Sequence, residues 1–524
     1  MKNIVIVLLI TIFVLLSFKK VYTSDTLIPN LEPYPDTLYY SIPAWNFVHG
    51  NGFVMKTQDT VIKQQTPPLF GLYLIPFFAF FKDIRSFYFA NIFLSILTII
   101  LFVNIIDKIF SGKTLYKGIL TLFLGFFLVT NFYFYSMPQL LMAEPFTLFL
   151  VTLGIYLYVS KPSNFKTFLS SQLGFLLILV KLSNVPYSVI FAILFFIKYF
   201  SLPKPNKYFK LFMIFTGISF LYTIGYIFAS QLLANHKNLG GSDFNFIHFK
   251  KGIETYTKIL IGKAGIRYLW YTENFIPSII ALLSIVGAIV GIFKSNFRKT
   301  TLALLSIILF TVIFMSFFVT QDARYIIAIL PAYLLLLGFT VQEISRKTSK
   351  AISIVFMILI ILLTLLFKNQ GYKENEISLL TFKKQVGLNL RHREVPWNYE
   401  AVQIFNKFTK DSDPKKTYMA TFLPAPFIEV YSNNNYQILP ISTWQEFYWL
   451  EPNLLKKVIG SDIVARYKKL IEEGNNVYIT YYYQSNVPSQ WPKQINELIS
   501  NFSVTKVYDG CLSACDIYQL KNIE

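Results

Sequence analysis

Residues 86–106 read SFYFANIFLSILTIILFVNII, and this stretch decides the fold. It carries no charged side chain, and as a helix it is long enough to cross a bilayer, which takes about 20 apolar residues. Ten further apolar runs predict helices of the same kind, near residues 4–18, 119–135, 144–159, 168–182, 185–200, 211–231, 276–293, 300–318, 323–341 and 351–367. The sequence therefore predicts a polytopic α-helical membrane protein with about eleven transmembrane helices.

The composition agrees with a lipid environment. Hydrophobic residues make up 54% of the chain, aromatic residues 18% and charged residues only 15%, which is well below the usual charged share of a soluble protein. A formal charge of +20 often indicates a nucleic-acid partner, but here Lys and Arg gather in the short gaps between apolar runs. We therefore expect the bilayer as a partner and no nucleic acid.

The first apolar run, residues 4–18, has the length of either a short span or the core of a signal peptide. Lys19 and Lys20 follow it directly, where a signal peptide would carry small residues before its cleavage site. Their long side chains can reach the interface from a short helix. We favour an uncleaved span.

The distribution of basic residues predicts the orientation in the membrane. The gaps 107–118, 160–167, 198–210, 294–299 and 342–350 together hold fifteen Lys or Arg against two acidic residues. Loops rich in Lys and Arg stay on the cytoplasmic side. We therefore expect a multi-pass protein of the plasma membrane with a cytoplasmic N-terminus, and with residues 21–85, 232–275 and 368–524 outside.

The chain changes character after Phe367. A strand-sized apolar run, Val477 to Tyr483, follows the helix-like segment Ile463 to Glu473, which predicts a small extracytoplasmic α/β domain over residues 368–524, after a membrane domain over residues 1–367. The only two cysteines, Cys511 and Cys515, lie in this domain. In an oxidising compartment a disulfide between them is the favoured interpretation, and two free thiols are the alternative.

The first outer segment, Pro33 to Phe81, ends in an apolar stretch after Pro68. A full span there would invert the charge rule for every later loop, so we expect a re-entrant or interfacial helix. This placement leaves Asp36 just above the bilayer surface.

Short motifs occur in a fixed order along the predicted outer face. The first outer segment contains an Asp, paired aromatics, an Ala, a glycine turn and a Pro-Pro-Leu element: Asp36, Tyr39, Tyr40, Ala44, Gly50, Gly52, Pro67, Pro68 and Leu69. Later outer ends supply an acid beside a proline and an Arg-Tyr pair before a proline: Ala143, Glu144, Pro145, Arg324, Tyr325 and Pro331. In the order of its motifs along the chain, and in the side of the membrane on which they are expected, this set resembles the GT-C superfamily of membrane glycosyltransferases. The resemblance is strongest to the protein O-mannosyltransferase and aminoarabinose transferase branch.

The resemblance implies a function. Such a protein would transfer a sugar from a polyprenyl-phosphate donor to a lipid, glycan or protein acceptor on the extracytoplasmic face, with inversion of configuration. Many relatives carry Glu directly after the first Asp, whereas this chain has Thr37, and it has Gln65 and Thr66 before the proline pair. The resemblance therefore predicts the superfamily but does not predict the substrate.

The two acidic candidates have catalytic and structural interpretations. Asp36 is the candidate general base for the acceptor hydroxyl, or else a turn or N-cap residue of a helix. Glu144 is the second acid, assisting Asp36 or binding a divalent metal ion, or else a Glu that is favourable at a helix N-terminus beside Pro145.

Several basic and aromatic residues are candidates for binding. Arg324 is the candidate phosphate ligand, because its guanidinium group can bind phosphate with two hydrogen bonds, and a salt bridge to Asp322 is the alternative. Lys181, near the outer end of a span, is either a second phosphate ligand or a residue reaching the interface. Tyr325 and Tyr40 complete the expected substrate-binding set. In the long outer loop, His236 and His248 are candidates for binding a metal ion, although a lone loop histidine is more often a solvated or structural residue. Tyr268, Trp270 and Tyr271 in the same loop are candidates for stacking on a sugar or isoprenoid, or form an interfacial aromatic belt.

Two other classes of function stay open. A lipid or polysaccharide transporter or flippase would also be polytopic, although neither inverted repeats nor several charges within spans are evident. An extracellular binding or assembly protein would not need acids at the bilayer surface. Convergence of Asp36, Glu144 and Arg324 at one place would favour the enzyme.

Overall fold

The structure is a computed structural model. It describes residues 1–18, 28, 31, 36–57, 60–62, 66–203, 206–234, 245–262, 275–318, 321–367, 398–421, 423, 425–441, 462–480, 496–509 and 516–523. The chain divides into two compact units. The first comprises Met1–Thr23, Gln65–Phe81 and Ser86–Thr381, and the second comprises Ser24–Gln64, Lys82–Arg85 and Phe382–Glu524. The first outer segment therefore contributes to both units.

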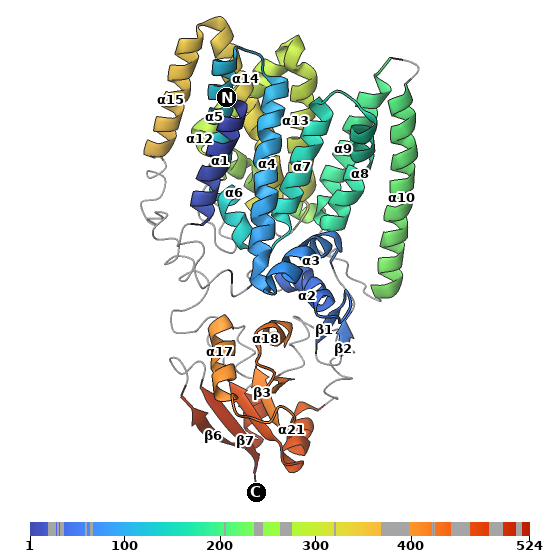
Figure 1. The fold of residues 1–524 in the computed structure, drawn as a ribbon, viewed down its shortest axis with the longest axis vertical. Coiled ribbons are helices and arrows are strands. Elements are labelled where there is room, and N and C mark those ends of the chain that lie inside the picture. The colour runs from blue at the N-terminus through green and yellow to red at the C-terminus, as the bar shows by residue number, and fades with distance from the viewer. Residues whose placement is uncertain are drawn as a thin grey trace. The chain divides into compact units, whose positions relative to one another are not determined.

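The first unit is a bundle of apolar helices (Figure 1). Its first half contains α1 (Lys2–Ser17), α3 (Leu69–Phe81), α4 (Phe87–Ile109), α5 (Thr114–Val129), α6 (Phe132–Ser136), η2 (Met137–Gln139), α7 (Glu144–Val159), α8 (Asn164–Val180), η3 (Leu182–Asn184), α9 (Val185–Phe200) and α10 (Lys207–Ala234). Its second half contains η5 (Phe246–His248), α11 (Phe249–Leu260), α12 (Ser278–Phe293), α13 (Ser295–Met315), η6 (Ala323–Ile329), α14 (Leu330–Lys347) and α15 (Lys350–Phe367).

Each apolar run found in the sequence corresponds to a helix of this bundle. In the described part of the chain, five helices are long and apolar enough to cross a membrane, or up to six if α5 and the bent segment Phe132–Gln139 form one broken span. The other apolar helices, among them α1, α7 and α8, are shorter. The polytopic helical class is confirmed, whereas the count of eleven spans stays a prediction. The helix expected after Pro68 is present as α3.

The first apolar run is an integral part of the bundle. Val5, Leu9 and Phe13 of α1 are buried, and the carbonyl of Ser17 accepts a hydrogen bond from the Tyr88 hydroxyl of α4 at 2.8 Å. A side chain at Gly125 in α5 would place its Cβ 2.3 Å from a methyl group of Leu9, so a larger residue there would force the Leu9 side chain to move. The first apolar run therefore packs as a helix of the bundle, and that it stays uncleaved remains a prediction.

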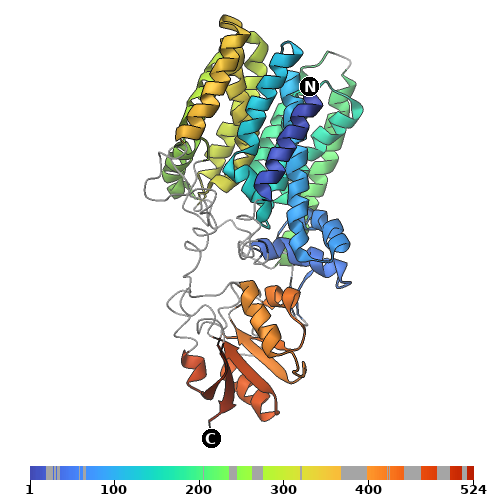
Figure 2. The same cartoon turned by 60° about the vertical axis from the view of Figure 1, so that its left-hand side comes forward.

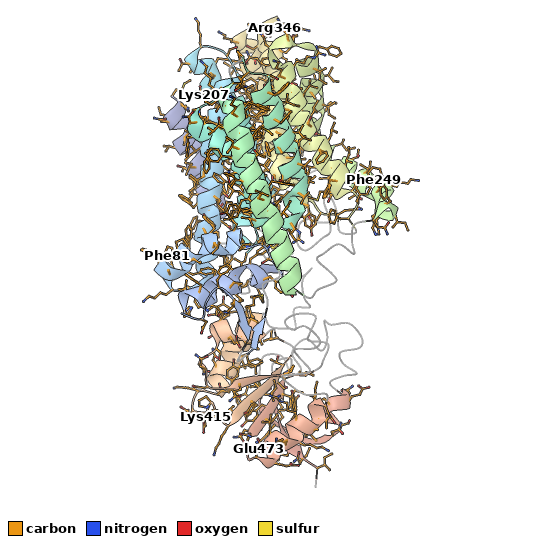
Figure 3. All side chains as sticks on the ribbon, turned by 90° about the vertical axis from the view of Figure 1, so that its right-hand side faces the viewer. Phe81, Lys207, Phe249, Arg346, Lys415 and Glu473 are labelled. Carbon is orange, nitrogen blue, oxygen red and sulfur yellow. The ribbon has the colours of Figure 1, made fainter. Side chains whose placement is uncertain are left out.

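The five basic gaps lie at one end of the helical unit. Contacts join them to one another through the pairs Gln342–Ser111, Lys294–Glu343 and Lys198–Ser160, and through the ring of Tyr156, which both Lys108 and Lys166 face. Figure 3 shows Lys207 and Arg346, from two of these gaps, at that end. The fold therefore gathers the basic gaps at one end of the helical unit, as the predicted orientation requires. Which end faces the cytoplasm stays a prediction.

The span formed by η6 and α14, Ala323–Lys347, is the most buried of the five long apolar helices of the described chain, with 89% of its apolar stretch inside the bundle. Its neighbour α12 approaches it closely at Gly287, where a Cβ would lie 1.8 Å from the carbonyl oxygen of Leu336. Small residues allow such close helix packing in membranes. The segment η6, which carries Arg324, leads directly into α14 and so into this closely packed part of the bundle.

The second unit contains a five-stranded mixed sheet with the order β4-β3-β5-β7-β6 (Figure 2). Its strands are β3 (Thr417–Thr421), β4 (Gln437–Pro440), β5 (Asn476–Thr480), β6 (Phe502–Tyr508) and β7 (Ile517–Asn522), and its helices include α17 (Asn398–Phe408), α18 (Ala425–Tyr431) and α21 (Ile463–Glu472). Strands β4 and β5 run parallel to β3, while β7 is antiparallel to β5 and β6. The expected small α/β domain is confirmed, including the strand and the helix predicted in it.

Apolar side chains of the strands and of α21 form the core of this sheet, among them Leu439, Val477, Ile479 and Tyr467. An ion-pair cluster lies at its β6–β7 edge. Hydrogen bonds to Asp516 and Asp509 raise the pKa of Lys506, and the Lys506 ammonium lowers the pKa of Asp509. These charges join the end of β6 to the start of β7.

The first outer segment supplies α2 (Asp36–Val48) and the hairpin of β1 (Met55–Thr57) with β2 (Thr60–Ile62) to the second unit. Helix α18 contacts both α2 and β1. Gly50 and Gly52 have φ angles of 79° and 78°, a backbone conformation that glycine adopts readily, and they form the turn between α2 and β1. Residues far apart in the sequence thus build one unit.

Candidate functional site

A buried ion pair joins α7 to the end of α8. The Lys181 ammonium donates a hydrogen bond of 2.7 Å to Oε1 of Glu144. The Glu144 side chain is 4% exposed and the Lys181 side chain 15%, so the pair is largely withdrawn from solvent. An ionic contact held in such surroundings depends on close geometry, because each charge has lost its hydration. Two of the residues chosen from the sequence therefore meet directly.

Arg324 and Tyr325 lie at the start of η6 and face the same cluster. The Arg324 guanidinium donates a hydrogen bond of 2.8 Å to the Tyr325 hydroxyl. Its Nε lies 3.9 Å from a carboxylate oxygen of Asp322. The Lys181 ammonium lies 5.0 Å from the centre of the Tyr325 ring, which connects the two halves of the cluster. Glu144, Lys181, Arg324 and Tyr325 thus converge at one end of the helical unit.

Local sequence explains why each of these side chains is placed there. Glu144 opens α7 and Pro145 follows it in the first turn, where a missing N–H is harmless and a negative charge is favourable. Asp322 is the N-cap of η6, and its Oδ1 accepts the backbone N–H of Arg324 at 2.9 Å. Pro331 then lies in the first turn of α14.

A buried asparagine holds the break between α8 and α9 against α7. The Asn184 side chain donates hydrogen bonds of 2.8 Å to the Thr147 hydroxyl and 3.0 Å to the carbonyl of Leu177. Lys181 precedes this break in extended backbone, with φ −161° and ψ 132°. Asn184 therefore fixes the position from which Lys181 reaches Glu144.

The chemistry of the cluster is that of two cations beside two carboxylates. Lys181 and Arg324 are positive, and Glu144 and Asp322 are negative, so these four groups balance one another in formal charge. The second Glu144 oxygen, Oε2, is buried and accepts no hydrogen bond from the described residues. A carboxylate oxygen in that state can accept a proton or a hydrogen bond from a ligand hydroxyl. Adjacent cations can stabilise a phosphate.

The other predicted site residues lie elsewhere or outside the described residues. Asp36 is the first residue of α2, which agrees with the alternative interpretation of Asp36 as a residue at a helix start. The Asp36 side chain is not among the described ones. Tyr40 is buried in the same helix. Both belong to the second unit, so their convergence with Glu144 and Arg324 stays a prediction.

The metal and disulfide hypotheses are likewise not decided. Among the described residues no three His, Cys, Asp or Glu side chains are grouped so that they could hold a metal ion. His248 ends η5, with its carbonyl 3.5 Å from the Gln321 side chain. Outside the described residues lie His236, Cys511, Cys515, Tyr268, Trp270 and Tyr271.

Sequence reasoning did not find two of the residues that build the cluster. Asn184 was missed because a lone asparagine between apolar runs has no distinctive pattern. Tyr187, whose hydroxyl lies 3.4 Å from the carbonyl of Tyr325, was missed because it looks like one more aromatic residue of an apolar helix. Asp322 was considered only as an alternative partner of Arg324, although an Asp directly before the first residue of a helix is a known N-cap signal.

Comparison with solved structures identifies the fold. ArnT from Cupriavidus metallidurans bound to undecaprenyl phosphate superposes with a TM-score of 0.62 at 12% identity, over 99% of this chain and 98% of that one. The chain has a GT-C fold. The arabinofuranosyltransferase AftD from Mycobacteria shares this GT-C fold with a TM-score of 0.53 at 10% identity, over 98% of this chain and 40% of that one. No protein-family model and no curated protein matches the sequence.

A third GT-C structure, the oligosaccharyltransferase from Archaeoglobus fulgidus tethered with an acceptor peptide, matches with a TM-score of 0.50 at 10% identity, over 100% of this chain and 74% of that one. These identities are low, so what is shared is the fold. With the apolar helices described above, the GT-C fold makes the chain a multi-pass membrane protein.

The ion pair between Glu144 and Lys181 leads to a prediction about stability. Glu144→Gln keeps the shape but leaves the Lys181 charge buried without its counter-ion, so we expect the folded state to lose about 3–5 kcal/mol. The double variant Glu144→Gln/Lys181→Met removes both charges and should lose less than the sum of the single losses. The unfolding of the detergent-solubilised chain, followed by circular dichroism, measures both.

The exposed pair Glu254–Lys258 on α11 provides a matched control, since its side chains are 62% and 54% exposed. Glu254→Gln should leave unfolding unchanged, because exposed pairs contribute little. Additive losses for Glu144 and Lys181 would show that the two charges do not stabilise each other in the folded protein.

Proposed function

We propose that the chain is a membrane glycosyltransferase that transfers a sugar from a polyprenyl-phosphate donor to an acceptor hydroxyl or amine. The observation that carries the proposal is the convergence of Glu144, Lys181, Arg324 and Tyr325 at one end of a GT-C helical unit. A binding protein with this fold would have no chemical need for buried acids and bases gathered at a helix end, and a transporter would be expected to carry several charges within its spans. The ArnT structure, which contains undecaprenyl phosphate, supports the donor class.

The two cations suit the phosphate of such a donor. When the bond between the anomeric carbon and the phosphate oxygen breaks, negative charge develops on the phosphate. Arg324 would stabilise this charge with its planar guanidinium group, and Lys181 would add a second positive charge. Tyr325, which contacts both cations, would hold them in place for the phosphate.

The acidic residues suit the acceptor. A general base takes the proton of the acceptor as its oxygen or nitrogen attacks the anomeric carbon from the face opposite the phosphate, so the configuration inverts. Asp36 is the proposed base, on the predicted extracytoplasmic face. Glu144 would orient the acceptor or the sugar through Oε2 and hold the Lys181 ammonium in place through Oε1. A divalent metal ion bound by Glu144 would add a further positive charge beside the phosphate, and its presence stays a prediction.

Mass spectrometry of the purified protein tests the donor class. We expect lipid extracts of the wild-type chain to contain a polyprenyl phosphate or its glycosylated form at a higher ratio to protein than extracts of Arg324→Gln/Lys181→Gln. Removing two cations from a phosphate site should weaken its retention by at least about a hundredfold. Equal amounts in both preparations would contradict the assignment of these two residues to the phosphate.

A transfer assay separates the enzyme from a transporter. In a detergent solution, where no membrane separates two compartments, an enzyme still moves a labelled sugar from polyprenyl phosphate to an acceptor, and a transporter produces no new glycosidic bond. If the label stays on the lipid and no new sugar-containing product appears, the transporter or flippase is favoured.

A further inference from the structure

Three lysines meet at the end of the helical unit that is opposite to Glu144. Lys108 lies in the last turn of α4, Lys166 in the first turn of α8 and Lys198 in the last turn of α9. The ammonium groups of Lys108 and Lys166 lie 5.4 Å and 5.8 Å from the centre of the same ring, that of Tyr156 in α7. We call these four residues the lysine cluster. Because α7 runs from Glu144 to Val159, the cluster is one helix length away from the candidate active site.

Lys198 is held rigidly in this cluster. Its ammonium donates hydrogen bonds of 2.5 Å and 2.7 Å to the carbonyls of Leu157 and Ser160, which end α7. A cation at a helix C-terminus is favourable there. Leu157 directly follows Tyr156, whose ring Lys108 and Lys166 face, so all three ammonium groups gather at the end of α7.

The positive charge of the cluster is not balanced by the described residues. No carboxylate in that part of the chain lies within ion-pair distance of the three lysines, and the nearby Asp107 pairs instead with Lys2 and Lys117. The N-terminus of α8 adds positive potential, and its first turn contains Lys166 and no acidic residue. Like charges gathered in this way favour an anion between them.

The surroundings indicate which anion fits. Exposed apolar side chains flank the lysines along the chain: Phe165 beside Lys166 is 68% exposed, and Phe200 close to Lys198 is 64% exposed. In a membrane helix such side chains face the acyl chains of lipids. A ligand that touches the ammonium groups and these rings together must have an anionic head and an apolar tail.

We propose that the lysine cluster binds the phosphate headgroup of an anionic phospholipid, at the membrane surface opposite to the candidate active site. Lys108 and Lys166 supply the charge, the Tyr156 ring holds both ammonium groups, and Lys198 orients the end of α7 beneath them. Basic pockets between transmembrane helices bind anionic headgroups by the same physics. The site does not depend on the proposed transfer reaction and uses none of its residues.

Lipid titration of the full-length chain in detergent tests the site, with phosphatidylglycerol as the probe and phosphatidylcholine as the neutral reference. Native mass spectrometry measures the apparent Kd of each lipid. Lys108→Gln/Lys166→Gln should raise the Kd for phosphatidylglycerol about thirtyfold, since each surface lysine contributes about fivefold to anionic-lipid binding. Binding of phosphatidylcholine should not change.

Matched controls decide the outcome. Lys113→Gln/Lys161→Gln removes two exposed lysines from the same end but outside the cluster, and it should leave the Kd within about twofold of wild type. Lys108→Arg/Lys166→Arg keeps both charges and should bind like wild type. The proposal is overturned if both Gln double variants lose binding equally, or if inorganic phosphate displaces the lipid at the concentration at which the lipid itself binds.

Discussion

Arg324→Ala is expected to lower the rate of sugar transfer at least about a hundredfold, which is the usual effect of removing one charge-stabilising group from an active site. Arg324 would contact the donor phosphate both before and during bond breaking, so donor affinity and turnover should fall together. Initial rates over a range of donor concentrations, with a labelled polyprenyl-phosphate sugar, give both quantities.

Loss of folding must be separated from loss of chemistry, because Arg324 is buried and lies beside Asp322. Arg324→Lys keeps the charge but loses the planar group that can bind phosphate with two hydrogen bonds, so it should fold and show an intermediate loss. Arg298→Ala is the matched control, since Arg298 is exposed at the opposite end of the helical unit. If Arg324→Ala folds and is as active as Arg298→Ala, Arg324 is no phosphate ligand.

Asp36→Asn should reduce turnover by at least about a hundredfold, the scale expected of a general base. The amide keeps the shape of the side chain but cannot take a proton at neutral pH. Donor binding should be nearly unchanged, so the loss should appear in kcat and not in KM for the donor. Single-turnover transfer at saturating donor measures it.

The control for this variant is Asp411→Asn, an exposed aspartate of the C-terminal α/β domain. It should transfer sugar at the wild-type rate. Near wild-type turnover of Asp36→Asn would refute Asp36 as the base, and Glu144→Gln would then be the variant to assay, with its stability measured in parallel.

Local sequence was sufficient to predict most of the helical unit. A run of about 20 apolar residues has few alternatives to a buried or membrane helix, so α4, α13 and α14 were found near their true positions. The distribution of Lys and Arg predicted which loops share one end, and contacts such as Lys294–Glu343 join those loops. The sharp bend of 63° after α5 was not predicted, because Asn131 and the short helix that follows it lie within an almost continuous apolar stretch.

The candidate site was predictable only in part. The motif around Glu144 and the Arg324–Tyr325 pair pointed to one membrane side, and the structure brings them together with Lys181. The pairing of Glu144 with Lys181 was not predicted, because it depends on which helix ends become neighbours, and single-sequence patterns carry little information on that. The assignment of α2 to the same unit as α18 was missed for the same reason.

The origin of the second unit in two distant parts of the chain has a consequence for how the protein is made. Helix α2 and strand β1 are synthesised near the beginning, whereas α18, which contacts both, is synthesised near the end. Translation proceeds at about 5–20 residues per second, so α2 waits on the order of tens of seconds for its partner while the whole helical unit is inserted. During that time its apolar face must be shielded by lipid or by a chaperone. A chain that stops after α15 would leave this early segment permanently without its partner.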